Sequence, residues 1–546
     1  MRPRAVGETR ALALGVVLAG SPGTSVPGWL ADAIRDGLGG VILFAENTPD
    51  VATTRRLTDA MRACRPPAAA PLVIAVDEEG GDVTRLQARE GSSLPGNAAL
   101  GAVDDIDLTR RCGAALGRLL ADAGVDLDLA PVLDVASDTR NPVVGTRSFG
   151  ADAGLVARHG IAMAQGLAGH VSVCGKHYPG HGATRVDSHL ALPVVRGSLA
   201  TLEARDLAPF VALSRAGLLD AVMTGHLVVP ALGSEPASLS RWATDRIRAT
   251  GHEGAIITDA LGMGAISGAL GRSGSGPDGS ARDRHEGSGR EGSGREDSGH
   301  EGSGLGEACV RAIEAGADLV CLDAPHQRDA QAALVEAVDA IEAGLASGRL
   351  SPHDLRRSAG RVARLARRSD ERPGDDLAAQ ELEAVGLEAA RRAVRTPGGA
   401  RLALAGPAVV VDVRAKASLA AGRTGSTYSR VLASDGPDEV GVVALDSATQ
   451  VEAALGGADE CGEVVVLTRD PRGDAGERAL LDAVVRARPR AIVVHLGVSA
   501  TAPDGIERVV LGYGTGLANA RAVGELLRGH LVAGATTAAR PAREAR

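Results

Sequence analysis

The chain has 546 residues, of which 44% are hydrophobic and 23% charged, a composition typical of globular proteins with more than one core. A formal net charge of −9 offers no basic surface for nucleic acid, and an aromatic content of 1% excludes a base-stacking surface. No apolar run reaches the roughly 18 residues of a membrane-spanning helix. Six cysteines without a C-x-x-C motif favour free thiols in a reducing compartment, which we expect to be the cytoplasm.

The first 370 residues alternate between short apolar runs and stretches of helical periodicity. Residues 1–20 resemble a signal peptide in their charged start and apolar continuation, but no A-x-A site follows, so we expect the first strand there. Helical stripes occupy segments such as 107–123, 153–168 and 199–216. Eight buried strands alternating with helices predict an α/β fold of the TIM type, a closed (β/α)8 barrel. The expected strands are residues 12–18, 40–44, 72–76, 127–133, 171–175, 221–224, 255–258 and 319–322.

One segment fits neither pattern. Residues 271–304 contain a decaying five-residue repeat of the form E-G-S-G-R with almost no apolar content. Such a segment gains too little from burial to offset its ordering entropy, so we expect a disordered insertion between the seventh strand and the next helix.

A second alternating set begins near residue 400. Its apolar runs predict an open parallel α/β domain, with helices at 479–486 and 516–527. Between the two sets, helical stretches flank the E-R-P-G-D-D sequence at 371–376. We therefore predict a barrel over residues 1–370, a helical linker over 371–398 and a C-terminal α/β domain over 399–546. The expected strands of the second domain are residues 401–404, 409–413, 440–445, 463–468, 491–496 and 509–511.

Ionisable residues follow five of the barrel strands, at the end where barrels of this type carry their reactive groups. They are Asp77 and Arg85 after the third strand, Asp134 and Arg147 after the fourth, Lys176, His177 and His181 after the fifth, His226 after the sixth and Asp259 after the seventh.

Structural roles are open for several of these residues. Asp77 and Asp134 could cap helices, Arg147 could be a surface cation, and the P-G-H-G sequence could be a simple turn. Lys176 is harder to explain in this way, because only two of the 59 basic residues are lysines and a compact ammonium differs most from a guanidinium when it is buried.

Asp187 and His189 are two residues apart in a loop after a Gly-rich turn. This spacing lets the carboxylate bind one imidazole nitrogen and leave the other for general acid/base work. With Asp259 as a second reactive group, this is the minimum set for retaining glycoside cleavage, although the usual partner is a second carboxylate.

A metal site is the competing interpretation, because His177, His181, His226 and Asp259 are residue types that bind zinc. Metal-dependent barrel hydrolases typically carry His-x-His after the first strand, whereas this chain has Leu-Ala-Gly-Ser-Pro at residues 18–22. We expect no cofactor, and a metal-dependent amidohydrolase and an inactive sugar-binding barrel stay as alternatives.

Residues 176–189 resemble the K-H-[FY]-P-G-H-G…D-S-H signature of the β-N-acetylglucosaminidase (β-N-acetylhexosaminidase) branch of glycoside hydrolase family 3. Residues 257–263 are similar to its nucleophile strand, and residues 77–86 to its D-Q-E-G-G-R-V-x-R-L segment, with Glu78 in place of Gln and Asp82 in place of Arg. The similarity covers residues 10 to about 370. We expect Asp82 to place a negative charge near the mouth of the site.

The resemblance implies that Asp259 is the nucleophile, that His189 is the acid/base and that Asp187 orients His189. It further implies sugar-binding roles for a set of five residues, which are Asp77, Arg85, Arg147, Lys176 and His177.

The predicted function is a retaining exo-β-N-acetylglucosaminidase acting on peptidoglycan-type or chitin-type fragments through a glycosyl-aspartate intermediate. A phosphorylase is the alternative, because a neutral histidine repels phosphate less than a carboxylate does. Three aromatic residues, Phe44, Phe149 and Tyr178, are predicted on the rim of a pocket for one sugar. The expected partner is a small oligosaccharide, without nucleic acid or membrane, and the expected assembly is a monomer or small homo-oligomer.

Overall fold

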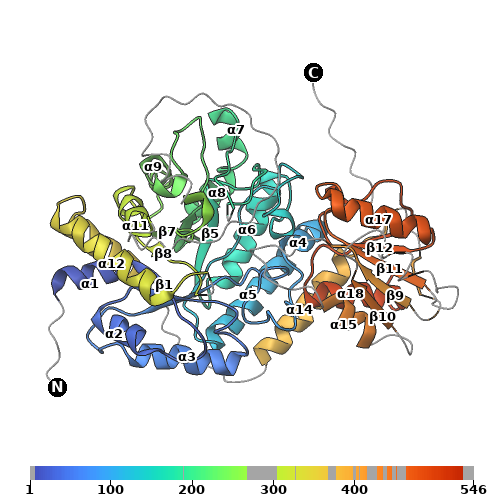
Figure 1. Cartoon of the computed structure of the whole chain (residues 1–546), viewed down its shortest axis with the longest axis horizontal. Helices are drawn as coiled ribbons and strands as arrows, with labels where there is room; N and C mark the ends of the chain where they lie inside the picture. Colours follow the sequence, from blue (N-terminus) through green and yellow to red (C-terminus); the bar gives the residue numbers. More distant parts are fainter. Residues whose placement is uncertain are drawn as a thin grey trace, which may run out of the picture.

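The computed structural model describes most of the chain (Figure 1). The described residues are 7–188, 190–266, 304–325, 327–366, 377–397, 401–404, 406, 408–414, 427–434, 440–444, 451, 455 and 463–532. Residues 271–303 of the predicted insertion, and the predicted acid/base His189, lie outside them.

Eight parallel strands form the N-terminal sheet, in the order β7-β6-β5-β4-β3-β2-β1-β8. A parallel bridge between Ile257 and Leu319 joins the two ends of this order and closes the barrel. The predicted (β/α)8 barrel is therefore confirmed. Its strands are β1 (Val17–Gly20), β2 (Gly40–Leu43), β3 (Val73–Val76), β4 (Leu127–Asp128), β5 (Ser172–Tyr178), β6 (Ala221–Thr224), β7 (Ala255–Thr258) and β8 (Val320–Cys321).

Two apolar layers hold the barrel together. Alternate strand residues such as Leu18, Val73 and Ile257 fill the interior, and their neighbours such as Val17 and Ile74 pack outward against the helices. Half of these helices begin at Asp or Ser residues whose side chains cap the first turn, for example Asp50, Asp105 and Asp152. The helices are α1 (Glu8–Leu14), α2 (Gly28–Asp36), α3 (Val51–Ala63), α4 (Asn97–Val103), α5 (Ile106–Asp122), α6 (Ala153–Leu167), α7 (Leu199–Ala204), α8 (Ala208–Arg215), α9 (Arg241–Ala249), α11 (Leu305–Glu314), α12 (Ala330–Ala346) and α13 (Pro352–Ala363).

Several predicted strands and helices have other bounds in the structure, as three examples show. The first predicted strand, residues 12–18, begins inside α1, and β1 starts only at Val17. The predicted helix 199–216 is two helices, because α7 ends before Arg205 and α8 starts anew with a proline in its first turn, where proline is tolerated. Residues 401–404 form no strand, and Leu404 instead donates its backbone N–H to the Leu527 carbonyl at a helix end.

The C-terminal sheet has five parallel strands in the order β10-β9-β11-β12-β13, which confirms an open parallel α/β arrangement. Its strands are β9 (Ala408–Asp412), β10 (Val440–Ala444), β11 (Glu463–Thr468), β12 (Ile492–His495) and β13 (Val509–Leu511). Its described helices are α15 (Thr427–Ser434), α17 (Ala475–Ala487) and α18 (Leu517–Leu527).

One helix, α14 (Leu377–Ala393), lies between the two sheets and contacts α4 and α5 on one side and α18 on the other (Figure 1). Gly386 allows this close approach, because a Cβ there would meet the Ser93 carbonyl oxygen at 1.8 Å. Ion pairs reinforce both sides, Arg111 with Glu388 at 2.8 Å and Arg391 with Glu525 at 2.6 Å. None of the helices that the structure describes has the length and apolar character to cross a membrane.

Candidate active site

A pocket of about 460 Å³, including its open mouth, lies at the carboxyl ends of the barrel strands. It gathers six of the residues predicted for the site, which are Asp77, Arg85, Arg147, Lys176, His177 and Asp259. Glu79, His181 and Ser188 add polar atoms, and Val83, Val143 and Met223 add an apolar portion of the wall.

Lys176 is buried at the end of β5 between two carboxylates. Its Nζ donates to Asp77 Oδ1 at 2.6 Å and lies 2.7 Å from Glu79 Oε1. Burial alone lowers the pKa of Lys176, but Asp77 and Glu79 outweigh burial and raise the pKa above its ordinary value. The lysine is therefore a fixed cation. No helix begins directly after Asp77, so the capping role is excluded for this residue.

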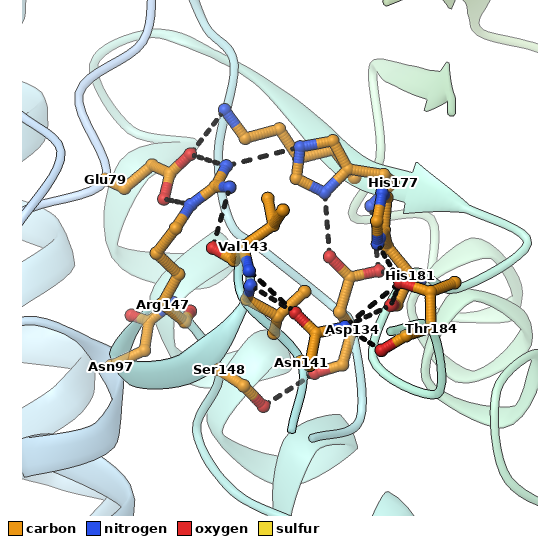
Figure 2. Close-up of polar contacts among 12 residues, drawn as sticks. Glu79, Asn97, Asp134, Asn141, Val143, Arg147, Ser148, His177, His181 and Thr184 are labelled. Atoms are coloured by element: carbon orange, nitrogen blue, oxygen red, sulfur yellow. Dashed lines mark hydrogen bonds and ion pairs between the residues drawn. The ribbon is translucent and has the colours of Figure 1, made fainter. Parts of the chain in front are cut away.

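Arg147 is not a surface cation, since only 7% of its side chain is exposed. Its guanidinium makes two hydrogen bonds to Glu79, from Nε to Oε2 at 2.8 Å and from Nη2 to Oε1 at 2.7 Å (Figure 2). Burial raises the pKa of Glu79, but Arg147 and Lys176 reverse this and hold the pKa well below its usual range. Glu79 is a carboxylate shared by two buried cations, and our sequence reasoning missed it.

Asp134 orients two histidines from beneath. Its Oδ2 lies 2.7 Å from His177 Nδ1, and its Oδ1 accepts the backbone N–H groups of His177 and His181 at 3.2 and 2.7 Å (Figure 2). Burial raises the pKa of Asp134, but His177 and these hydrogen bonds lower it overall. An ionised Asp134 assigns the proton to His177 Nδ1, so Nε2 accepts from Arg147 Nη2, 3.2 Å away. Asp134 thus acts as an orienting group rather than a helix cap.

His181 faces the pocket as a neutral imidazole. Its Nδ1 lies 2.8 Å from the Thr184 hydroxyl, and its Nε2 is buried with no hydrogen-bond partner in the described part of the chain. Burial lowers the pKa of His181 to about 4, although Asp134 opposes this effect. The ring therefore offers a neutral polar edge to a ligand.

Glu78 supports the loop that carries Arg85. Its Oε2 accepts the backbone N–H groups of Arg85 and Leu86 at 2.8 and 2.9 Å, while Oε1 is buried without a partner among the described residues. Burial raises the pKa of Glu78 despite these hydrogen bonds. Glu78 has the length and branching of glutamine, and its Oε2 accepts the two backbone N–H groups that an amide oxygen could also accept.

Asp259 follows β7 and is fixed through its backbone, which donates to the Thr224 carbonyl at 3.0 Å. The N–H of Ala260 donates to Asp259 Oδ1 at 2.9 Å. His226 supports the same turn, with Nε2 2.8 Å from the Ala260 carbonyl and Nδ1 2.7 Å from the Ser238 hydroxyl. Both nitrogens of His226 are thus occupied, and the described residues contain no cluster of three or more potential metal ligands.

The loop of the predicted acid/base approaches Asp259 through the backbone. Ser188 lines the pocket, and its carbonyl accepts the N–H of Ala265, in the helical segment 264–266 after the seventh strand, at 3.2 Å. Asp187 is described, but His189 is not, so the roles of this pair stay predictions.

Two expectations about the rim are wrong. The Asp82 side chain does not reach the mouth of the pocket, because it is buried and bound to Thr515 and Arg469 of the C-terminal domain. Phe149 and Tyr178 are only 2% exposed and belong to the core under the helices, where Phe149 stacks on His159 and Tyr178 packs edge-on against Phe210. Tyr178 faces outward because the register of β5 shifts between Gly175 and Tyr178.

The chain is similar in sequence to glycoside hydrolases. Residues 25–277 match the model of the glycosyl hydrolase family 3 N-terminal domain. A β-hexosaminidase of Neisseria meningitidis serogroup C is 42% identical over 246 residues, which span 43% of this chain and 66% of the relative. β-Hexosaminidase A of Pseudoalteromonas piscicida is 36% identical over 267 residues, or 45% of this chain and 44% of the relative.

A solved structure resembles nearly the whole chain. It is a glycoside hydrolase family 3 β-N-acetylglucosaminidase from Paenibacillus sp. str. FPU-7, with a TM-score of 0.78 and 28% identity over 96% of this chain and 98% of that one. The likeness therefore includes the C-terminal sheet as well as the barrel.

Proposed function

Because the chain belongs to glycoside hydrolase family 3, we propose that it is a retaining exo-β-N-acetylglucosaminidase that releases terminal N-acetylglucosamine from small oligosaccharides. One observation carries the proposal. One pocket joins Asp259 to hydrogen-bonding side chains from β5 and from the segments that follow β3 and β4, which are Asp77, Arg147, Lys176 and His177. A carboxylate in a pocket with such side chains suits attack on a bound sugar ring.

The reaction has two steps. In the first, Asp259 attacks the anomeric carbon, the bond to the leaving oxygen breaks with its electron pair on that oxygen, and His189 gives it a proton. In the second, water attacks the glycosyl-aspartate, returns a proton to His189 and frees the sugar with its original configuration. Asp187 orients His189 in both steps, a role that the sequence motif supports.

The pocket walls suit one N-acetylated sugar. Lys176 and Arg147 are locked by Glu79, so their remaining donors meet sugar hydroxyl groups with little loss of side-chain entropy. Val83, Val143 and Met223 offer an apolar wall for an acetyl methyl group. The volume of about 460 Å³ includes the open mouth, so the enclosed space is smaller and favours a single terminal residue over a polymer chain.

Replacing the proposed nucleophile is the direct test. Asp259→Ala should reduce turnover of an aryl N-acetyl-β-glucosaminide roughly 10³-fold or more, because no other group can form the covalent intermediate. Asp107→Ala, which removes a carboxylate that is 83% exposed on α5, is the matched control and should leave turnover unchanged. Mass spectrometry with a fluorinated glycosyl reagent should find the sugar on Asp259, and sugar on another residue would refute the assignment.

The same assay separates hydrolysis from phosphorolysis. With wild-type protein, free N-acetylglucosamine should be the product whether or not phosphate is present. Phosphate-dependent formation of N-acetylglucosamine 1-phosphate would instead make the protein a phosphorylase.

We further propose that the substrates are peptidoglycan-type or chitin-type fragments used in cell-wall recycling in the cytoplasm. Four buried free cysteines, Cys112, Cys174, Cys309 and Cys321, support a reducing compartment. Comparing kcat/KM for N-acetylglucosaminyl-N-acetylmuramic acid and chitobiose would rank the two substrate types, and fractionation of the source cells would test the compartment. Light scattering should find a monomer or small homo-oligomer, without added nucleic acid or lipid.

A further inference from the structure

Asp82 is a buried carboxylate shared between the two domains. Its Oδ1 accepts two hydrogen bonds from Thr515, from the backbone N–H at 2.6 Å and from Oγ1 at 2.8 Å. Its Oδ2 accepts the Thr146 hydroxyl at 2.8 Å and lies 3.1 Å from Arg469 Nη2. Three of these contacts come from the C-terminal domain and one from the barrel. Burial raises the pKa of Asp82, but Arg469 and the hydrogen bonds lower it overall, so the group is charged.

The barrel residue that contacts Asp82, Thr146, directly precedes the pocket residue Arg147 in the chain. Thr146 and Arg147 belong to the same short 3-10 helix, η1 (Gly145–Arg147). Asn97 Nδ2 donates to the Arg147 carbonyl at 2.7 Å, and Glu79 holds the guanidinium from the other side. Arg147 is therefore fixed at its backbone and at its side chain, and its neighbour Thr146 is fixed by Asp82. Asn97, Glu79 and Arg147 are labelled in Figure 2.

Asp82 lies within one tight turn, which Glu79 directly precedes. Glu79 N–H donates to the Val83 carbonyl at 3.1 Å, and Val83 N–H donates to the Gly80 carbonyl at 3.2 Å. Gly81 has a φ of +59°, and a Cβ there would meet Gly96 Cα at 2.7 Å. A turn packed so closely cannot move Asp82 without moving Glu79, and both residues hold the Arg147 loop.

The C-terminal residues come from the carboxyl ends of its parallel strands. Arg469 directly follows β11, and Thr515 lies between β13 and α18. Ala518 at the start of α18 also donates its N–H to the Ser92 carbonyl at 3.2 Å. In open parallel sheets this edge usually holds a ligand, but in this protein it holds the Asp82 turn of the barrel.

We propose that Asp82 is a positioning residue through which the docked C-terminal domain fixes the Arg147 loop in its sugar-binding geometry, an inference that rests on the proposed function of that pocket. A buried carboxylate that loses most of its donors is strongly destabilised. Asp82 keeps its place only while Thr515 and Arg469 are present, so docking of the domain and order of the loop are coupled.

The test uses the full chain and three variants that cut the link at different points, Asp82→Asn, Arg469→Ala and Thr146→Val. Each should raise KM for the aryl N-acetyl-β-glucosaminide roughly tenfold, with a smaller change in kcat, because Arg147 binds the sugar without reacting. Thr146→Val is decisive, because it leaves every contact between the domains intact. Arg430→Gln is the matched control, since it removes a domain contact, the hydrogen bond to the Glu90 carbonyl at 2.6 Å, that does not involve Asp82.

The double variant Arg469→Ala/Thr146→Val should be no worse than the more impaired single variant, because both changes break one chain of contacts. The proposal would be overturned if the KM increases of the two single variants multiplied in the double variant, or if Arg430→Gln raised KM as much. Asp82 would then only hold the two domains together.

Hydrogen exchange separates this proposal from the proposed function, because it needs no turnover. Amides of residues 145–150 should exchange faster in Asp82→Asn and Arg469→Ala than in wild type or Arg430→Gln, while those of β5 stay unchanged. Equal exchange of 145–150 in all four proteins would refute the coupling. If the wild-type protein lacks turnover but the exchange rates follow this pattern, the proposed activity is refuted and the coupling through Asp82 is supported.

Discussion

The two parallel sheets present similar side chains at their carboxyl ends and use them differently. At the barrel edge, Glu79 binds two cations whose other donors face a pocket. At the edge of the five-stranded sheet, Glu477 accepts the Thr468 hydroxyl and the N–H groups of Arg469 and Asp470, and His495 Nε2 lies 3.0 Å from the Val498 carbonyl. The barrel edge keeps donors free for a ligand, whereas at the other edge most of these polar atoms bind within the protein, and His495 Nδ1 is buried without a partner among the described residues.

The largest difference in stability between the two edges is expected when the charge at position 79 is removed. Glu79→Gln leaves Lys176 and Arg147 buried with too little negative charge, so it should lower the free energy of unfolding by roughly 3–5 kcal/mol and abolish sugar binding. The matched change at the other edge is Glu477→Gln. The three donors at Glu477 all bind Oε1, which an amide oxygen can replace, so this change should cost little. Denaturant titration of both variants checks the difference, and equal losses would show that the edges are alike.

Acid should act on both edges through buried histidines. Burial lowers the pKa of His181 at the barrel edge and of His495 at the other edge to about 4. The unfolded chain binds protons on these residues below about pH 6.5, whereas the folded protein does not until about pH 4. The unfolded state therefore gains protons in this window, and stability should fall as the pH drops from about 6.5 to 4, by on the order of 1–3 kcal/mol for each histidine.

The measurement is the denaturant midpoint at several pH values. His495→Gln should flatten the profile without changing turnover. An unchanged slope in that variant would mean that His495 is already protonated in the folded protein.

The smallest effect is expected for Glu78→Gln. An amide oxygen can accept the hydrogen bonds from Arg85 and Leu86 that Oε2 of Glu78 accepts, so the change in stability should be less than about 0.5 kcal/mol. Thermal melting compared with Glu79→Gln checks this result. A large loss would show that Glu78 is ionised and serves the pocket as Glu79 does.

The sequence allowed the architecture to be predicted because apolar strand runs and helical stripes are local signals, and strand ends converge in any closed barrel. It located Lys176, Arg147 and Asp259 for that reason. It missed the role of Glu79, which lies in an acidic run. No feature of the neighbouring sequence distinguishes a carboxylate that binds two buried cations from one that is exposed to solvent. The Asp82–Thr515 contact spans 433 residues and leaves no pattern in either segment. Tyr178 was misplaced because the register shift in β5 breaks the alternation that orients strand side chains.

Helix α14 gives the chain a property beyond its active site. Leu382, Val385 and Ala389 belong to the core of the barrel, whereas Ala390 and Ala393 belong to the two cores that flank the second sheet. A helix that completes three cores cannot be assigned to one side, so cleavage on either flank would leave an apolar face exposed. Barrel and sheet should therefore unfold in one cooperative transition, because neither core is complete without α14.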